Sequence, residues 1–178
     1  EKQKLDILTY VLEHADIPVI LDADALNLTA RYQLSLSDYS VSLAVTPHLG
    51  EMARLCSTDI SNIASDLISS AEEFARSQNV ICVLKDAGTV VSNGNETYIN
   101  TSGNSGMATA GSGDVLAGIF VGLTAQGMDL FEAAKLAVFL HGRAGDQAAL
   151  RYGKRSMTSA DLIDGLVFIL AGSEDKVM

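Results

Sequence analysis

The sequence predicts an α/β fold: a mainly parallel sheet with helices on both faces, in three α/β/α layers, and an antiparallel hairpin at one side. Short apolar stretches of strand length alternate along the chain with longer stretches whose apolar residues recur at helical spacing. Such alternation is typical of parallel strands joined by helices that cover the sheet. Two β-type stretches flank Asn93-Gly94-Asn95, where Asn-Gly supplies the positive φ angles of a tight turn.

The elements are expected in a regular order. Apolar strands are expected at residues 18–21, 41–45 and 80–84, and the hairpin at residues 89–99. Helices are expected at residues 5–14, 25–32, 62–77, 114–125, 130–151 and 160–171. Because no repeat or linker interrupts this order, residues 1–178 are expected to form a single domain. The start at Glu1, directly inside a helical pattern, suggests a piece of a longer sequence.

Composition limits the kinds of partner. The chain has 178 residues, of which 12 are basic and 22 acidic, so its formal net charge is −10. No basic cluster offsets this excess, which disfavours a nucleic-acid or anionic-membrane partner, because the phosphates would be repelled. A small anionic ligand remains compatible, since it needs only a local pocket of backbone N–H groups.

Two further features favour a cytoplasmic protein. No apolar run approaches the ~20 residues of a membrane span, and no charged-then-apolar leader opens the chain. Cys56 and Cys82 lie among apolar neighbours without metal-type spacing. We therefore expect buried, reduced thiols, which suit a reducing compartment.

Polar residues follow each of the three predicted parallel strands. They are Asp22-Ala23-Asp24, Thr46-Pro47-His48 and Lys85-Asp86. The carboxyl ends of parallel strands gather at one edge of an open sheet, where ligands bind. The three clusters are therefore expected to converge on one crevice.

The sharpest chemical signal is the glycine loop within residues 108–118, which read Ala-Thr-Ala-Gly-Ser-Gly-Asp-Val-Leu-Ala-Gly. Gly111 and Gly113 remove side chains where the backbone must approach a ligand closely. The helix that follows leaves unpaired N–H groups pointing back at the loop, and its dipole favours an anion such as a phosphate. Asp114 stands at the helix start and faces the same space. The simpler alternative, that Ser112 or Asp114 only caps the helix, leaves the two glycines unexplained.

The run Gly111-Ser112-Gly113-Asp114 resembles the Gly-X-Gly-Asp signature of the ribokinase-like superfamily. In that superfamily the glycine backbone forms an anion hole for the transferred phosphoryl group, and the aspartate takes the proton of the attacking hydroxyl. Residues 19–27, 46–55, 85–89 and 103–114 narrow the resemblance. In this order they are similar to the ADP/ATP-dependent NAD(P)H-hydrate dehydratases, the carbohydrate-kinase-like domain of the YjeF type, of which the chain would be the C-terminal portion.

The resemblance implies a role for each matched position. The adenine nucleotide would be contacted by Lys85, Asp86, Ala87, Gly88, Thr89 and Gly113. The hydrated nicotinamide would be contacted by His48, Asn104 and Asp114, with Asp114 as the catalytic base. The anion hole would consist of Gly111, Ser112 and Gly113, and Glu51 would help to hold a metal. The family usually has Gly at the position of Asp86 and often Pro at that of Leu49, and Asp86 adds negative charge near the phosphates.

The implied activity is that of a lyase of metabolite repair. It would return (6S)-hydrated NADH or NADPH to NADH or NADPH by phosphorylating the ring hydroxyl and then eliminating phosphate. The implied cofactors are ADP or ATP with Mg²⁺, and the partners are the hydrated cofactor and the adenine nucleotide, without nucleic acid or membrane. Family members commonly assemble, so a homo-oligomer, for example a homotetramer, is expected.

Simpler interpretations of single residues remain open. Without the motif, His48 would be a hydrogen-bonded turn residue. Lys85 fits a solvated position, and Glu51 fits an acidic residue of a first helical turn. Asp24 and Asn27 could line the crevice, although capping explains either residue.

Two other classes of function also remain open. One is a small-molecule kinase of the same superfamily, and the other is a nucleotide-binding module without catalysis. His141, which has Leu136, Val138 and Phe139 nearby, is expected to be a hydrogen-bonded helix residue rather than a ligand.

Overall fold

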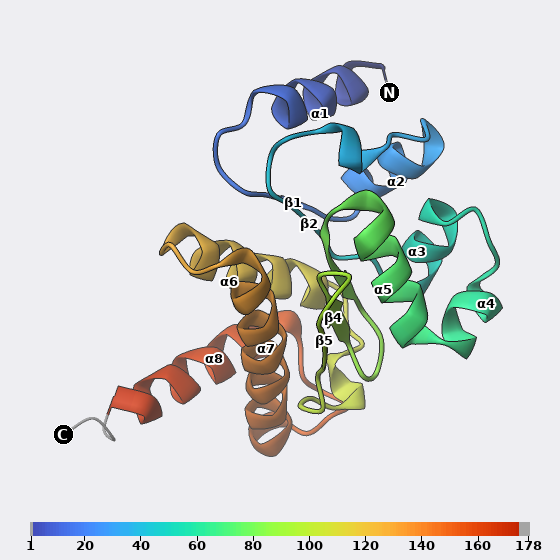
Figure 1. Cartoon of the computed structure of the whole chain (residues 1–178). Coiled ribbons are helices and arrows are strands. Elements are labelled where there is room, and N and C mark those ends of the chain that lie inside the picture. Colours follow the sequence, from blue (N-terminus) through green and yellow to red (C-terminus); the bar gives the residue numbers. More distant parts are fainter. Residues whose placement is uncertain (1, 175–178) are drawn as a thin grey trace. The chain divides into compact units, whose positions relative to one another are not determined.

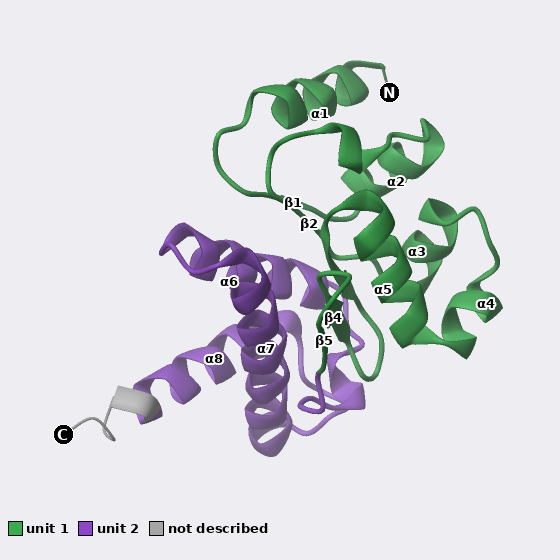
Figure 2. Ribbon diagram, viewed as in Figure 1, with its two compact units in different colours: residues 1–99 green, residues 100–178 purple. Residues whose placement is uncertain are grey.

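The computed structural model describes residues 2–174 and divides the chain into two compact units, residues 1–99 and 100–178 (Figure 2). The first unit contains the whole sheet, and the second is helical (Figure 1). Each unit is described by itself, and the expected single domain stays a prediction. None of the helices within residues 2–174 is both long and apolar enough to cross a membrane.

The elements of the first unit follow the expected order, but a helix at Leu49–Leu55 and a 3₁₀ turn at Leu36–Asp38 were not predicted. Its helices are α1 (Lys2–His14), α2 (Asp24–Arg31), α3 (Leu49–Leu55), α4 (Ile60–Ser65) and α5 (Leu67–Gln78), with a 3₁₀ turn η1 at Leu36–Asp38. Its strands are β1 (Val19–Leu21), β2 (Leu43–Val45), β3 (Ile81–Leu84), β4 (Val90–Ser92) and β5 (Thr97–Ile99).

The five strands form one mixed sheet in the order β1-β2-β3-β4-β5. Strands β1, β2 and β3 are parallel, with Leu21 opposite Val45 and Val45 opposite Cys82. Strand β4 pairs antiparallel with β3 and β5. The predicted parallel sheet with an antiparallel hairpin is thus confirmed.

The helices of the first unit share one apolar core with a face of the sheet. Leu12 of α1, Leu26 of α2 and Met52 of α3 belong to this core together with strand residues such as Val45 and Leu84. Side chains alternate between the two faces of a strand, so the next residues along lie on the other face. That face is apolar too: its Ala44, Val83 and Val91 are buried.

The helix predicted at residues 62–77 is wrong in one respect, because the chain breaks at Asp66 into α4 and α5. Asp66 leaves helical geometry at φ −151° and ψ 86°, and its carboxylate accepts the backbone N–H of Ser69 at 3.0 Å and the Ser69 hydroxyl at 2.7 Å. These hydrogen bonds hold the pKa of Asp66 below its usual range. The side chain thus starts a new helix where the apolar periodicity continues.

The expectation of two buried thiols holds for only one cysteine. Cys82 in β3 is buried, and burial raises the pKa of its thiol. Cys56 is exposed because it ends α3 as its C-cap, although partial desolvation still raises the pKa of its thiol, with a smaller contribution from Glu73. Both thiols are free, as predicted.

The hairpin connection also differs from the expected tight turn, in which Asn-Gly supplies the positive φ angles. Ser92 pairs with Thr97, so four residues, 93–96, join β4 to β5. Only Gly94 has a positive φ, at 87°, while the Asn93 side chain accepts the N–H groups of Asn95 and Glu96. A Cβ at Gly94 would lie 2.9 Å from the backbone of Arg76, so glycine is required there.

The second unit consists of η2 (Ser105–Met107), α6 (Ser112–Ala125), α7 (Leu130–Tyr152) and α8 (Ser159–Glu174) (Figure 1). The three predicted helices are confirmed, each starting within two residues of its expected position. Asp129 caps α7 by accepting the N–H groups of Phe131 and Glu132. Helices α7 and α8 approach closely, because a Cβ at Gly165 would lie only 2.3 Å from the carbonyl oxygen of Ala144.

Candidate functional site

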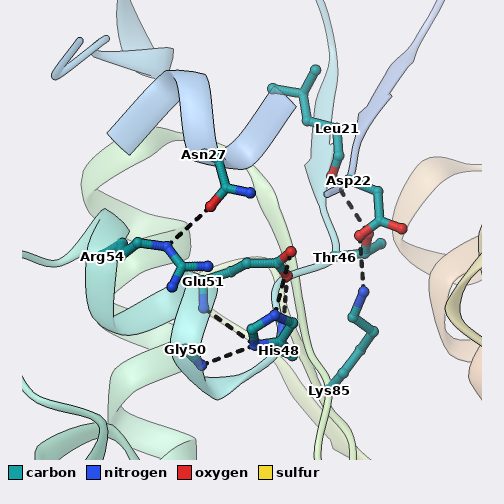
Figure 3. Close-up of polar contacts among 9 residues, drawn as sticks. All are labelled: Leu21, Asp22, Asn27, Thr46, His48, Gly50, Glu51, Arg54 and Lys85. Atoms are coloured by element: carbon teal, nitrogen blue, oxygen red, sulfur yellow. Dashed lines mark hydrogen bonds and ion pairs between the residues drawn. The ribbon is translucent and has the colours of Figure 1, made fainter. Parts of the chain in front are cut away.

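Polar residues at the carboxyl ends of β1, β2 and β3 are brought together, as the sequence predicted (Figure 3). The Lys85 ammonium lies 2.8 Å from Asp22 Oδ1, and each of these side chains is about one-fifth exposed. The backbone N–H of Lys85 donates to the carbonyl of Pro47 at 2.7 Å, and Lys85 forms a parallel bridge with His48. Lys85 is therefore a fixed, ion-paired residue rather than the solvated lysine of the simpler interpretation.

His48 caps α3 through a reciprocal pair of contacts with Glu51. Its Nδ1 accepts the N–H groups of Gly50 at 3.0 Å and Glu51 at 3.3 Å, and a Glu51 carboxylate oxygen accepts the N–H of His48 at 2.9 Å (Figure 3). In the neutral ring the proton must then sit on Nε2, which lies 3.5 Å from the other Glu51 oxygen. The simpler interpretation of His48 is thus observed, and its contact with substrate stays a prediction.

Glu51 is almost fully buried, at 6% exposure of its side chain, while 54% of the His48 side chain is exposed. A buried carboxylate needs hydrogen-bond donors, and the capping pair supplies them. Across residues 2–174, no group of three or more His, Cys, Asp or Glu side chains is arranged to hold a metal. Within these residues, Glu51 therefore has no cluster of further protein ligands that would support its predicted metal role.

The predicted nucleotide segment, residues 85–89, is the connection between β3 and β4. Asp86 and Ala87 are exposed, whereas Gly88 and Thr89 are half-buried. The Thr89 hydroxyl donates to the Asp86 carbonyl at 3.3 Å, which closes the turn. The segment thus presents its backbone and the exposed Asp86 carboxylate beside the ion-paired Lys85.

Neither Asp24 nor Asn27 caps a helix. The N-cap of α2 is Ala23, which has φ 50° and makes no side-chain capping bond. Asp24 pairs instead with Lys4 at 2.8 Å, and this partner holds the pKa of Asp24 below its usual value. Asn27 accepts a hydrogen bond from Arg54 Nε at 3.0 Å (Figure 3).

The glycine loop of the second unit leads directly into α6. Gly111 is the N-cap in the left-handed region, at φ 83°, and a Cβ there would lie 2.8 Å from the Ser159 hydroxyl. The Ser112 hydroxyl lies 3.2 Å from His141 Nε2, so Ser112 is not the cap, and His141 is hydrogen-bonded as expected. No side chain caps α6, which contradicts the simpler interpretation of Ser112 and Asp114 as mere caps.

The first turn of α6 therefore keeps donors for an incoming group. The N–H of Ser112 donates to Thr109 and that of Val115 to Gly111, but within residues 2–174 the N–H groups of Gly113 and Asp114 have no acceptor. The Asp114 side chain is exposed in the same turn. Unpaired amides at the positive end of a helix dipole form a site for an anion, and the adjacent carboxylate can accept a proton.

Asn104, a predicted substrate contact, has its side chain already engaged. Its Nδ2 donates to the Gly145 carbonyl at 2.9 Å and to Asp146 Oδ1 at 3.1 Å, while its Oδ1 accepts the N–H of Gly106 at 3.0 Å. Asp146 is a residue that the sequence reasoning missed. In the sequence it looks like a solvated acidic residue of the long helix α7, and only the fold shows its partner 42 residues away.

Comparison with known proteins agrees with these features. The Moorella thermoacetica bifunctional NAD(P)H-hydrate repair enzyme Nnr is 43% identical over 174 residues, which are 97% of this chain and 33% of that protein. The ADP/ATP-dependent NAD(P)H-hydrate dehydratase of Bacillus subtilis, co-crystallized with ATP/Mg²⁺, aligns with a TM-score of 0.82 at 28% identity, over 96% of this chain and 58% of that one. This chain thus spans about a third of the Moorella relative.

The predicted fold class is confirmed by a further solved structure. A ribokinase-like superfamily protein from Enterococcus faecalis aligns with a TM-score of 0.80 at 26% identity, over 96% of this chain and 59% of that one. The family model for NAD(P)H-hydrate dehydratase matches residues 1–167. The chain has a ribokinase-like α/β fold and belongs to the NAD(P)H-hydrate dehydratase family.

Proposed function

We propose that this chain carries the dehydratase activity that converts hydrated NADH and NADPH back to NADH and NADPH with ADP or ATP as phosphoryl donor. The observation that carries the proposal is the start of α6, where two amides lack acceptors beside the exposed carboxylate of Asp114. Membership of the family supplies the substrate class. Because this chain spans only part of its relatives, the activity is proposed for the protein that contains it.

The chemistry requires an activated leaving group. Hydroxide leaves poorly, so the ring hydroxyl first attacks the terminal phosphorus, a new C–O–P link forms, and the bond from phosphorus to the nucleotide's bridging oxygen breaks. Asp114 takes the hydroxyl proton as general base. The lone pair of the ring nitrogen then expels phosphate, and loss of a proton from the neighbouring carbon restores the double bond.

Each residue of the proposed site then has a task. The N–H groups of Gly113 and Asp114 would hold the transferred phosphoryl group, for which positioning and electrostatics supply most of the catalysis. Residues 85–89 would contact the nucleotide, and His48, through its Nε2–H, would donate to the hydrated nicotinamide. Gly111 would shape the loop through its positive φ, and Ser112, whose N–H and hydroxyl are already hydrogen-bonded, would hold the loop in place.

Mg²⁺ would enter with the nucleotide. The ion usually keeps several waters and binds phosphates with one or two carboxylates, rather than a cage of protein ligands. Glu51 fits such a limited role, because one of its oxygens makes only the 3.5 Å contact with His48 Nε2. When bound, the metal would neutralise phosphate charge.

Cytoplasmic location and homo-oligomerisation, for example as a homotetramer, are further parts of the proposal. Free Cys56 and Cys82 suit a reducing compartment. Large apolar side chains on α8 are exposed, among them Val167 at 63% and Phe168 at 68%, and such side chains favour association between copies.

One assay tests the function. Hydrated NADH is incubated with the protein and either ADP–Mg²⁺ or ATP–Mg²⁺, and recovery of the reduced-nicotinamide absorbance is followed together with phosphate release. We expect recovery with at least one nucleotide and equal amounts of the two products. Nucleotide turnover on other alcohols without recovery would indicate a small-molecule kinase, and binding without turnover would indicate a non-catalytic module.

A further inference from the structure

The segment at residues 100–107, which leads through η2 towards the glycine loop, is fastened to one face of α7. The Ser102 hydroxyl lies 3.1 Å from the carbonyl of Phe139 and donates to it, and the Asn104 amide donates to that of Gly145 at 2.9 Å. The contacted positions Phe139, Gly142 and Asp146 follow one another at spacings of three and four residues, which places them on one face of the helix. The segment is therefore held along almost two turns of α7.

Two glycines of α7 let the segment approach at backbone distance. A Cβ at Gly142 would lie 2.1 Å from the Ser102 hydroxyl and 2.7 Å from the Ser102 backbone, and a Cβ at Gly145 would lie 2.2 Å from the Met107 sulfur. Such distances leave no room for a methyl group. The segment consequently has little freedom to shift towards the helix, and its position depends on what holds it in place.

Asp146 is the charged group that does so. Its Oδ2 accepts the N–H of Gly103 at 3.1 Å, and its Oδ1 accepts the side-chain amide of Asn104 at 3.1 Å. One carboxylate thus binds a backbone and a side-chain donor of adjacent residues. Hydrogen bonds to an ionised acceptor are the stronger kind.

We infer that Asp146 is a positioning residue of the proposed site, and that Asn104 acts through Asp146 instead of donating to the substrate. Both donor protons of the Asn104 amide are directed to the protein, one to Gly145 and one to Asp146. The pair fixes the segment that joins the sheet unit to the glycine loop. This inference rests on the proposed function for its catalytic readout.

The test compares Asp146→Asn with a matched control, Asp129→Asn. Both change an aspartate to its amide, but Asp129 is the N-cap of α7, and its hydrogen bonds go to Phe131 and Glu132 rather than to residues 100–107. In Asp146→Asn an NH2 group takes the place of one carboxylate oxygen. This NH2 group then faces a hydrogen-bond donor of Gly103 or Asn104, so one of the two hydrogen bonds is lost. We expect its KM for hydrated NADH to rise ~10-fold, the scale of one charge-assisted hydrogen bond, with kcat and the nucleotide Kd within about twofold. Asp129→Asn leaves all three values unchanged.

A double-mutant cycle distinguishes positioning from direct contact. If Asn104 acts through Asp146, then Asn104→Ala, Asp146→Asn and the double variant raise KM to a similar extent, because one unit is lost in each. Multiplied effects in the double variant would overturn the inference, since they mean that Asn104 contacts the substrate on its own. An unchanged KM in Asp146→Asn would overturn it as well.

Amide hydrogen exchange keeps the inference testable without catalysis. In the unsubstituted protein, the Gly103 amide is expected to exchange at least ~10-fold more slowly than an unprotected amide, and Asp146→Asn removes this protection while Asp129→Asn retains it. Fast exchange at Gly103 in the unsubstituted protein would refute the positioning role of Asp146 even if a variant fails to fold. If the unsubstituted protein restores no NADH with either nucleotide, the proposed function fails. The exchange data alone then test whether Asp146 holds the segment at residues 100–107 in place.

Discussion

Helices α3 and α6 both start at residues predicted for the site, but they use their first backbone N–H groups in opposite ways. At α3, the His48 ring accepts the N–H groups of Gly50 and Glu51. At α6, no side chain caps the helix, and the N–H groups of Gly113 and Asp114 have no acceptor within residues 2–174. The helix dipole favours an anion at both starts, yet only α6 has donors left to bind it.

The difference separates stabilising residues from binding residues at positions that look alike in the sequence. The start of α3 is complete without a ligand, because the capping box satisfies its donors. The start of α6 gives up the free energy of a cap, about 1 kcal/mol, in exchange for free donors. We therefore assign binding of the phosphoryl group to α6 in the proposed reaction. The start of α3 would contribute only the proposed contact between the exposed His48 ring and the hydrated nicotinamide.

The largest expected effect is that of Asp114→Asn. The amide keeps the size of the side chain but cannot take a proton, so kcat for recovery of NADH should fall at least ~100-fold, the lower range for loss of a general base. Asp6→Asn, which removes another exposed carboxylate, on α1, serves as the control and is expected to keep full activity. Near-normal turnover by Asp114→Asn would show that α6 binds phosphate without supplying the base.

The two glycines of the loop should respond differently to alanine. Gly113→Ala is expected to weaken nucleotide binding ~10-fold in calorimetry, because the added methyl group would intrude where the phosphate approaches one of the free donors. The cost in stability should be small, because Gly113 lies within the α-helix. Gly111→Ala is expected to lower the free energy of unfolding by ~1–2 kcal/mol, since φ is 83° and Ser159 lies in the way. Equal effects on affinity and stability in both variants would remove the distinction between a shaping and a binding glycine.

The sequence anticipated the strand ends because their signals are local. An apolar strand followed at once by Asp22, by His48 or by Lys85 marks the edge where parallel strands end, and the structure joins Asp22 to Lys85 there. The sequence could not reveal partners that are distant along the chain. The bond between Asn104 and Asp146 crosses 42 positions, and nothing near Asp146 distinguishes it from a solvated acid.

Local competition explains the other misses. Leu67 and Ile68 continue the apolar period of the predicted helix, so the break at Asp66 is invisible to periodicity and depends on a carboxylate that prefers the Ser69 amide. Cys56 lies in an apolar context but is the C-cap that follows a short helix, where it is exposed. The catalytic and binding roles of Asp114, Lys85 and His48 stay predictions until the variants are measured.

His48 allows its two roles to be separated. His48→Ala should lower the free energy of unfolding by ~1 kcal/mol, because α3 loses its cap, whereas His48→Asn should keep most of that stability, since asparagine caps well. If the imidazole also contacts the hydrated nicotinamide, both variants raise KM several-fold. Normal kinetics in His48→Asn would instead reduce His48 to a cap, and α3 would then contribute only stability.

The smallest expected effect comes from Asp66, the N-cap of α5, which is predicted to have no role in catalysis. Its pKa is lowered in the folded protein by the Ser69 backbone and hydroxyl, so the carboxylate stabilises the fold above its unfolded pKa, near 3.8, and this contribution is lost as pH falls through the lower folded value. Asp66→Ala should reduce Tm by about 2 °C at pH 7, and the difference from the unsubstituted protein should shrink below pH 3.8. Turnover should be unaffected, because here the cap has no free donor to offer. A loss of activity comparable to that of Gly113→Ala would mean that capped and uncapped helix starts cannot be told apart by function, and the assignment of the phosphoryl group to α6 would lose its structural basis.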